Sequence, residues 1–320
     1  MKAILCSRYG APLEVLQLKE VEKPVPAEGR VLVRVRAASV NKMDLAPVRG
    51  ALVARLLGTG LTRPKDPRIG GDLAGVVEAV GPGVDRFHPG DEVFGTAPGS
   101  FAEFASARQD RLVPKPAGVS FEAAAAVPVA GLSALQGLRK GALRPGARVL
   151  VCGASGGVGT FAIQIARAAG AVVTAECSPA NLDQAHALGA ERVIDYTRED
   201  FSLDAERFDL ILAVNGHHSL RAYRRALTPT GRCVVLGGSF RQILQSLTLG
   251  PLFSRRGGRQ LLFLGIAQLN LADLDELGKL LAAGQLAPVI DRRYPLSRAA
   301  EAVGYLDEGH AHGKVVIDIE

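Results

Sequence analysis

The sequence predicts an α/β protein with two domains, an irregular β domain and a domain built on a doubly wound parallel sheet. Three observations support this prediction. The chain has 320 residues, which is long enough for two domains. Residues 1–118 hold short alternating apolar runs split by Gly and Pro, which are typical of an irregular β domain. In residues 119–265, apolar runs alternate with helical patterns, which indicates βαβ units, a parallel sheet and helices on both of its faces.

The expected elements follow this division. In the first part they are strands at residues 30–36, 75–80 and 91–95. In the second part they are strands at residues 148–152, 171–176, 208–214 and 232–236, and helices at residues 158–169, 180–188 and 218–227. The tail holds two amphipathic helical stretches and a closing strand, near residues 271–283, 297–308 and 314–319.

A Gly-rich turn, Ala154-Ser155-Gly156-Gly157-Val158-Gly159, lies between the first two strands of the second part. It has Ala154 where the dinucleotide-binding fingerprint usually has Gly. The missing Cβ of Gly156 would let the backbone approach a pyrophosphate at the start of the next helix, and Gly159 would allow that helix to pack closely. Glu176 ends the second strand, twenty residues after Gly156, where the fingerprint expects an acid. The Gly-rich turn, its flanking strands and helix, and the acid at Glu176 together predict a Rossmann dinucleotide-binding domain rather than a plain tight turn.

Composition narrows the class of protein. Hydrophobic residues make up 48% and charged residues 22% of the chain, as in ordinary globular enzymes. The formal net charge is +6, but the Arg clusters are short and not interleaved with aromatic residues, so we expect no nucleic-acid partner. No stretch approaches the roughly 18 apolar residues that span a bilayer, and the first residues lack the apolar core of a secretory signal. We therefore expect no membrane association and a cytoplasmic protein.

The cysteines predict no disulfide framework. Cys6, Cys152, Cys177 and Cys233 are far apart and form no Cys-x-x-Cys pair. Three of them, Cys6, Cys152 and Cys233, lie in or beside strand-like apolar runs. We therefore expect buried, inert thiols.

A set of short motifs runs along the chain in a specific order. They are ASVNKMD at residues 38–44, GGDLAGVV at 70–77, VGPGV at 80–84, PGDEVFG at 89–95, AAAVP at 124–128, GASGGVG at 153–159 and GHAHGK at 309–314. Their order and spacing resemble the medium-chain dehydrogenase/reductases, specifically the zinc-lacking quinone oxidoreductase and enoyl-reductase-like branch. The resemblance covers nearly the whole chain. It implies a GroES-like β domain of residues 1–118 and 271–320, to which the C-terminal segment returns, and a Rossmann domain of residues 119–270.

Two positions decide the metal chemistry. Zinc-dependent alcohol dehydrogenases of this superfamily carry a Cys near Asn41 and a Gly-His-Glu motif near residues 70–72, whereas Asn41 and Gly71 cannot supply zinc ligands. No Cys lies between Cys6 and Cys152, so the structural four-cysteine lobe is also missing. We therefore predict no metal. Because a quinone or a carbonyl conjugated to a double bond needs less polarisation than an unactivated carbonyl, we predict such an acceptor.

For catalysis the resemblance points to the loop that holds Asn41. Its amide could donate a hydrogen bond to a substrate carbonyl or orient the nicotinamide, and a loop cap is the alternative role. Lys42 and Asp44 follow on the same loop and either could relay a proton, although Asp44 is equally suited to a structural hydrogen bond. No residue stands out as an indispensable general acid, so water could supply the proton. The nicotinamide carries the hydride chemistry.

The resemblance also implies the cofactor contacts. At the pyrophosphate turn they are Ser155, Gly156, Gly157 and Val158. Ser178 and Tyr196 lie where this branch commonly holds the adenosine ribose and its 2′-phosphate, and Asn215 and Gly237 end later strands, at the edge where such sheets bind ligands. Two further candidates are Ser133, which could equally be a plain helix residue, and Lys314, which is weaker because a Lys in a terminal strand is usually solvated.

The cofactor stays open between NADH and NADPH. Glu176 aligns with the acid that accepts the ribose hydroxyls in NAD enzymes, and its carboxylate would repel a 2′-phosphate. Many relatives instead carry a small apolar residue there, followed by Cys-Ser and a basic residue. This chain keeps Cys177-Ser178 but continues with Pro179-Ala180-Asn181, which supplies no cation. Charge therefore favours NADH, the resemblance favours NADPH, and we leave the cofactor as NAD(P)H.

We predict a zinc-independent NAD(P)H-dependent oxidoreductase that transfers a hydride to a quinone or an α,β-unsaturated carbonyl. Two alternatives stay open: an alcohol or aldehyde dehydrogenase without zinc, and a non-catalytic NAD(P)H-binding redox sensor. The apolar segments 45–57 and 261–264 suit a small apolar carbonyl or quinone substrate, but a buried segment would look the same. A homodimer is expected from the resemblance alone.

Overall fold

The computed structural model describes residues 1–50, 55, 60–238, 240–248, 250, 254 and 258–320. The chain divides into two compact units, residues 1–130 with 269–320 and residues 131–268. Within the described part of the chain, no helix is both long enough and apolar enough to cross a bilayer.

The boundary lies later in the sequence than the expected one at residue 118. Helix α4 (Phe121–Ala125) packs against β3 (Arg30–Val40) and β4 (Asp72–Val80) of the first unit. Ala124 and Ala125 are fully buried there. Residues 119–130 therefore belong with the first unit, because their apolar side chains complete its core.

The first unit is built on a seven-stranded sheet with the order β14-β15-β3-β4-β5-β7, in which β6 also pairs with β3. All of its pairs are antiparallel except β14 with β15. The other strands of this sheet are β5 (Glu92–Thr96), β6 (Phe104–Arg108), β7 (Leu112–Pro114), β14 (Ile290–Pro295) and β15 (Lys314–Asp318). Strands β1 (Lys2–Cys6) and β2 (Leu16–Glu20) pair antiparallel in a separate two-stranded sheet. Its other helices are α1 (Pro12–Val15), α2 (Lys42–Arg49), α11 (Leu271–Ala282) and α12 (Ala299–Asp307).

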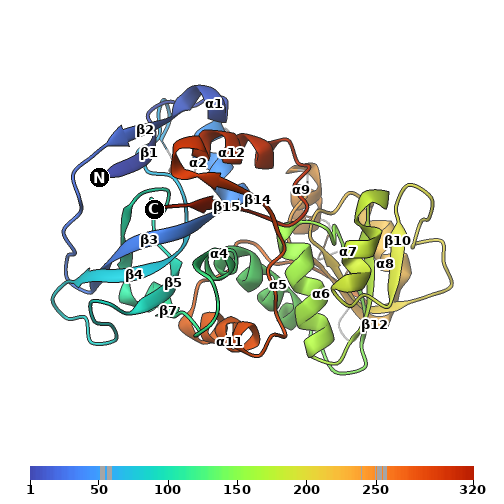
Figure 1. The fold of residues 1–320 in the computed structure, drawn as a ribbon. Coiled ribbons are helices and arrows are strands. Elements are labelled where there is room, and N and C mark those ends of the chain that lie inside the picture. The colour runs from blue at the N-terminus through green and yellow to red at the C-terminus, as the bar shows by residue number, and fades with distance from the viewer. Residues whose placement is uncertain (51–54, 56–59, 239, 249, 251–253, 255–257) are drawn as a thin grey trace. The chain divides into compact units, whose positions relative to one another are not determined.

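The C-terminal segment completes this first unit. Strand β15 lies between β14 and β3, with Val315 paired to Val40 and Asp318 paired to Ala37. Helix α12 packs against α1 and α2, as Figure 1 shows. A cluster of buried apolar residues from both chain segments, including Val35 and Ile317, forms the core. The tail therefore returns to the first unit because its apolar strand and helix faces are buried only there.

The second unit is a six-stranded parallel sheet with the order β10-β9-β8-β11-β12-β13. Its strands are β8 (Arg148–Cys152), β9 (Val172–Cys177), β10 (Arg192–Asp195), β11 (Phe208–Ala213), β12 (Leu227–Val235) and β13 (Gln260–Phe263). Its helices are α6 (Gly157–Ala168), α7 (Leu182–Ala187), α8 (Leu220–Ala226) and α9 (Phe240–Thr248), and α5 (Pro128–Lys140) runs into it from the first unit.

This strand order has a reversal between β8 and β11, the place where doubly wound sheets bind their ligands. Helix α6 packs on β8 and β9, α7 on β9 and β10, and α8 on β12 and β13. The expected strands and helices of this unit are found within a few residues of their expected bounds, except that β12 begins at Leu227. Leu227 joins the sheet early because it pairs with Phe208 across a register shift in β11.

Cys6, Cys152 and Cys233 are buried, as expected, Cys177 is buried too, and none of the four is in a disulfide. Burial raises the pKa of each thiol. For Cys177 the pKa is raised to about 11, with the charges of Asp195 and Glu176 adding to the effect of burial. The thiols are therefore protonated at neutral pH, which makes them poor nucleophiles and poor metal ligands.

Candidate cofactor and active site

The Gly-rich turn after β8 is held against the end of β9. The backbone N–H groups of Gly153 and Ala154 donate to the carbonyl oxygen of Glu176 at 3.2 and 3.0 Å. Gly153 has φ +78°, and Gly159 lies so close to the turn that a Cβ on it would be 2.2 Å from the Gly153 carbonyl oxygen. Gly159 is therefore required for α6 to begin directly beneath the turn, as the sequence predicted.

Gly156 has the opposite surroundings. It is the N-cap of α6, no side chain caps it, and a Cβ built on it would have only the Gly153 carbonyl oxygen within 4 Å, at 3.9 Å. The first backbone N–H groups of a helix, here those of Gly157 and Val158, have no acceptor within the helix. Open space above these donors, together with the positive end of the helix dipole, suits the binding of an anion such as a pyrophosphate. Ser155 lies half-buried beside them.

Two further predicted residues lie at the same edge of the sheet. A Cβ on Gly153 would be 3.0 Å from the N and Cβ atoms of Asn215, so the loop after β11 touches the turn after β8. Asn215 is exposed. Gly237 follows β12, and a Cβ there would be 2.8 Å from the carbonyl oxygen of Val214. The structure thus brings Gly156, Asn215 and Gly237 to the carboxyl edge of neighbouring parallel strands.

Glu176 is placed differently from what its expected role suggests. Its side chain is only 1% exposed, and its Oε1 lies 2.7 Å from His218 Nε2. Its Oε2 is buried and has no hydrogen-bond partner among the described residues. The carboxylate is therefore not freely open to a ribose, but one of its oxygens still lacks a donor. His218 was not identified as a site residue from the sequence. Its only signal was the His217-His218 pair, which follows Asn215-Gly216 after the strand expected at 208–214.

The other residues expected near the adenosine lie at the ends of β9 and β10. Ser178 is half-buried, and its Oγ accepts a hydrogen bond of 2.7 Å from Asn181 Nδ2. Tyr196 is 47% exposed, and its ring meets the ring of His217 edge-on at a centroid distance of 5.7 Å. Ser133 lies half-buried within α5, which suits the plain helix role left open for it.

In the first unit, Asn41 is the N-cap of α2 and is buried. Its Nδ2 donates to Asp72 Oδ2 at 2.9 Å and more weakly to the Ser39 carbonyl oxygen at 3.4 Å. Its Oδ1 accepts from Lys314 Nζ at 2.5 Å. Both ends of the amide are therefore engaged within the protein, and the choice between a structural role and donation to a substrate carbonyl stays a prediction.

Asp72 is the centre of this network and was not predicted as a site residue. It is fully buried, and its carboxylate accepts from Ser39 Oγ at 3.0 Å and from the backbone N–H of Val129 at 3.1 Å, at the start of α5. Lys314 Nζ lies 3.8 Å away. Burial raises the pKa of Asp72, while the Lys314 charge and the hydrogen bonds oppose that shift. The sequence signal was an acid at the start of a buried strand, directly after Gly70-Gly71.

Lys314, the weaker of the cofactor candidates, is not the solvated lysine that a terminal strand usually carries. It is 3% exposed, because it begins β15 inside the sheet, next to β3. Burial lowers its pKa, and the charges of Asp72 and Asp44 oppose that shift. Its ammonium is committed to Asn41, Asp72 and the Val40 carbonyl oxygen. Lys314 is therefore part of a buried ion-pair network, and its nitrogen is already engaged by protein acceptors.

Asp44 and Lys42 were both considered as proton relays, and Asp44 also as a structural hydrogen-bond partner. Asp44 Oδ2 accepts a hydrogen bond of 2.7 Å from the backbone N–H of Asn41, which is the structural bond weighed for it. Burial raises the pKa of Asp44 to about 7, and the charge of Asp72 adds to that shift while Lys314 opposes it. Lys42 is exposed on the first turn of α2. Asp44 is thus the group on this loop that can hold or release a proton near neutral pH.

The residues do not fit a catalytic zinc in the first unit. The positions that would carry its thiolate and imidazole ligands hold Asn41, whose amide is engaged, and Gly71, which has no side chain. Within the part of the chain that the structure describes, one group of three His, Cys, Asp or Glu residues has metal-ligand spacing, and it is Glu176, His217 and His218 of the second unit.

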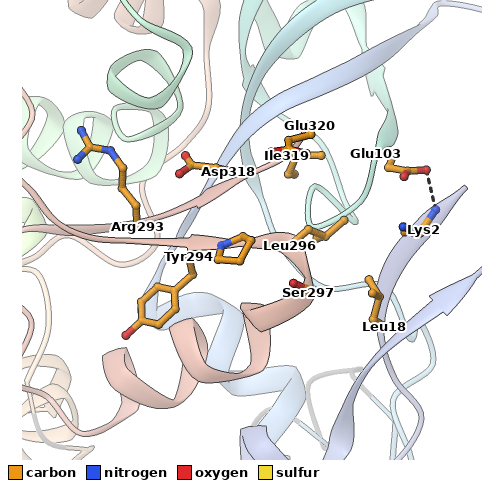
Figure 2. A pocket seen from close by; sticks show the side chains of 11 residues that line it. Lys2, Leu18, Glu103, Arg293, Tyr294, Leu296, Ser297, Asp318, Ile319 and Glu320 are labelled. Carbon is orange, nitrogen blue, oxygen red and sulfur yellow. Dashed lines mark hydrogen bonds between the residues drawn. The ribbon is translucent and has the colours of Figure 1, made fainter.

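Neither the cavity found in the first unit nor the two apolar segments expected to line a substrate pocket adds one of the described residues to the site above. A cavity of about 350 Å³ in the first unit is lined by charged residues of both signs, among them Lys2, Glu103, Arg293 and Asp318 (Figure 2). None of the predicted site residues lines it. Of the apolar segment 45–57, residues 51–54, 56 and 57 lie outside the described residues, and Leu261 of the segment 261–264 is buried in the core of the second unit. The buried-segment alternative therefore holds for Leu261.

Family models, curated relatives and solved structures all match this chain, and together the matches cover nearly its whole length. Residues 27–117 match the family model described as alcohol dehydrogenase GroES-like domain, and residues 188–317 match the one described as zinc-binding dehydrogenase. The chloroplast envelope quinone oxidoreductase homolog of Arabidopsis thaliana is 30% identical, over 99% of this chain and 98% of the relative. The 2-methylene-furan-3-one reductase of Solanum lycopersicum is 32% identical, over 99% of this chain and 79% of the relative. The solved structure of the quinone oxidoreductase from Coxiella burnetii superposes with a TM-score of 0.87 at 32% identity, covering 100% of this chain and 99% of that one.

Proposed function

The chain belongs to the medium-chain dehydrogenase/reductases, and from that premise we propose that it transfers a hydride from NAD(P)H to a quinone or an α,β-unsaturated carbonyl, without a metal. The observation that carries the proposal is the turn at Gly156, which leaves open space above the N-terminus of α6 at the reversal point of the parallel sheet. The relatives named as a quinone oxidoreductase homolog and a 2-methylene-furan-3-one reductase support the acceptor class.

Two features of the second unit fit the cofactor. The space at Gly156 would be filled by a Cβ, and a pyrophosphate needs that space to reach the N–H groups of Gly157 and Val158. Glu176 Oε2 has no hydrogen-bond partner within the described part of the chain, and a ribose hydroxyl is a donor that would suit it once the side chain turns toward the cofactor. When bound, the nicotinamide supplies the hydride, and these residues hold the rest of the molecule in place.

We propose NADH as the preferred form. The Glu176 carboxylate at the end of β9 accepts hydrogen bonds and repels a 2′-phosphate. The residues that follow it, Ser178 to Asn181, supply no cation, and the Ser178 hydroxyl is already bound to Asn181. Relatives with NADPH preference are expected to carry a cation there, so the charge balance of this chain favours the unphosphorylated ribose.

The protein's own contribution to the chemistry is positioning and proton supply. A quinone or conjugated carbonyl accepts a hydride without strong polarisation of its oxygen, which suits a site that lacks metal ligands at Asn41 and Gly71. Reduction also needs one proton. Asp44 can hold that proton near neutral pH, because burial raises its pKa to about 7. Water is the alternative donor, so the proposal does not depend on Asp44.

The decisive experiment is a cofactor-oxidation screen. Loss of the reduced nicotinamide absorbance is followed with quinones, enones, enals and simple aldehydes, with NADH and NADPH, and with and without a chelator. We expect turnover with quinones or conjugated carbonyls that a chelator does not lower. Activity lost with the chelator would overturn the metal-free mechanism. Tight nucleotide binding without turnover on any acceptor would favour the redox-sensor alternative, and oxidation of simple alcohols would favour the dehydrogenase.

A further inference from the structure

Two histidines converge on one buried carboxylate in the second unit. Glu176 lies near the end of β9, and His217 and His218 lie in the loop between β11 and α8. One possible ligand atom from each residue lies within 4.8 Å of the other two. Glu176 Oε1 is 2.7 Å from His218 Nε2, and the two imidazole rings are 4.1 Å apart between centroids, with a tilt of 38°.

This convergence is not what neighbouring residues usually do. Consecutive side chains of an extended chain point to opposite sides. Here a loop turns both rings toward one carboxylate, which is 1% exposed and has a second oxygen, Oε2, without a partner among the described residues. A buried carboxylate is costly unless its charge and lone pairs are compensated. His218 compensates one oxygen, and the other is left for a ligand.

The donor set identifies the class of ligand. Two imidazoles and one carboxylate are a common set for Zn²⁺, and other divalent ions of the late first transition row share the preference. Ligands about 2.0–2.1 Å from a tetrahedral Zn²⁺ lie about 3.3 Å from one another. That separation falls between the 2.7 Å of the Glu176–His218 pair and the 4.8 Å limit of the group. Small side-chain rotations therefore suffice.

The surroundings of the three side chains leave the ion open to water and, within the described residues, offer it no thiolate ligand. His217 is exposed and His218 half-buried, so the fourth position of the ion would face water. The Cys152 thiol is fully buried and is not part of the group whose possible ligand atoms all lie within 4.8 Å of one another.

We propose that Glu176, His217 and His218 form a site for a divalent transition-metal ion such as Zn²⁺, and that this ion and the cofactor exclude each other. The exclusion follows because Glu176 Oε2 is the oxygen assigned above to the cofactor ribose. This second part rests on the proposed function, whereas the metal site itself does not. The site is also separate from the catalytic zinc of alcohol dehydrogenases, whose ligand positions here hold Asn41 and Gly71 of the first unit.

The metal site is tested on the full chain, freed of metal with a chelator and then of the chelator, without nucleotide. Zn²⁺ binding is measured by calorimetry, and Co²⁺ is added separately because its visible absorption reports the coordination geometry. We expect one Zn²⁺ per chain and a four-coordinate Co²⁺ spectrum. His217→Ala, His218→Ala and Glu176→Gln should each weaken binding by roughly tenfold or more.

The matched control is His310→Ala. His310 is also exposed and, with His312, forms a His-x-His pair outside the proposed site, where an adventitious ion could bind instead. This variant should bind Zn²⁺ as the wild type does. Binding that is lost in His310→Ala but kept in His217→Ala would overturn the proposal, as would a Co²⁺ spectrum typical of six-coordinate, water-bound ion. Because His217 is exposed, its variant is expected to fold, and its melting temperature checks this.

Competition is tested last. Zn²⁺ affinity is measured again with saturating NADH, and the NADH affinity with saturating Zn²⁺. We expect each ligand to weaken the other by the same factor, tenfold or more, and we expect His217→Ala to remove most of the effect. Equal affinities with and without the partner ligand would overturn the exclusion and leave the metal site intact. A failure of NADH to bind without Zn²⁺ would count against the proposed function instead.

Discussion

Lys314 Nζ donates a hydrogen bond of 2.5 Å to Asn41 Oδ1, and this bond fixes the first residue of β15 to the N-cap of α2. Asn41 Nδ2 in turn donates to Asp72, and all three side chains are buried. Lys314 and Asn41 are 273 positions apart, so the network joins the two chain segments that make up the first unit. The role of this network is first of all the stability of that unit.

Lys314→Met is expected to destabilise the protein by about 3–5 kcal/mol, because it leaves the Asp72 carboxylate buried without its counter-charge. Urea unfolding measures the effect. Adding Asp72→Asn to the Met variant should recover part of the loss, since the uncompensated charge is then removed. If the free energy of unfolding of Lys314→Met lies within about 1 kcal/mol of the wild-type value, the buried ion pair does not contribute as proposed.

Lys115→Met is the matched control for this experiment. The Lys115 side chain is also buried, at 5% exposure, and it pairs with Glu92, which is half exposed. Because water can solvate the Glu92 carboxylate once Lys115 is gone, the loss should be smaller, about 1–2 kcal/mol. Equal losses in the two Met variants would mean that burial of the lysine stem, and not the abandoned carboxylate, sets the cost.

Asp44→Asn is expected to change how stability depends on pH. The pKa of Asp44 is raised from 3.8 to about 7, so the folded state holds this proton more tightly than the unfolded state. The stability from the protonated carboxyl is fully present below pH 4 and is lost as pH rises through 7. Each pH unit in that window costs up to about 1.4 kcal/mol. The Asn variant, which still accepts from the Asn41 N–H, should match the wild type near pH 4 and exceed it by a few kcal/mol at pH 8. A stability difference that does not widen with pH would refute this.

The parts of the structure that the sequence predicted well are those set by local pattern. The strand and helix alternation of the second unit and the Gly-rich turn are coded within short windows, and the steric demands at Gly156 and Gly159 follow from the turn itself. The acid at Glu176 was also found by spacing. Its burial beneath His218 was not, because that contact depends on the loop after β11 folding back onto β9.

The buried network of the first unit was missed for a related reason. Lys314 looked like a solvated residue of a terminal strand, and Asp72 like a remnant of a motif without its metal. Their burial depends on the insertion of β15 next to β3 and on the contact of Asp72 with the start of α5. Neither pairing leaves a periodic signal in the sequence.

The homodimer and the cytoplasmic location, which were expected from the sequence, stay predictions.

Gly156→Ala and Gly159→Ala should fail in different ways. A Cβ at Gly156 meets open space, so we expect a folded protein with a nearly unchanged melting temperature and at least tenfold weaker NADH binding. A Cβ at Gly159 would lie 2.2 Å from the Gly153 carbonyl oxygen, which forces α6 away from the turn, so we expect a large loss of stability. Thermal melts and NADH titrations separate the two effects. Unaltered NADH affinity in the folded Gly156→Ala protein would mean that the turn does not hold the pyrophosphate.

Glu176→Ala is expected to shift the cofactor preference toward NADPH. The substitution removes the carboxylate that repels a 2′-phosphate and frees the His218 Nε2 that now faces that carboxylate. The ratio of kcat/KM with NADPH to kcat/KM with NADH should rise tenfold or more, mainly through KM. Asp183→Ala, which removes an exposed acid from the first turn of the next helix, serves as the control and should leave the ratio within twofold. If the ratio is the same in both variants, Glu176 does not read the ribose, and the assignment of NADH as the preferred cofactor falls with it.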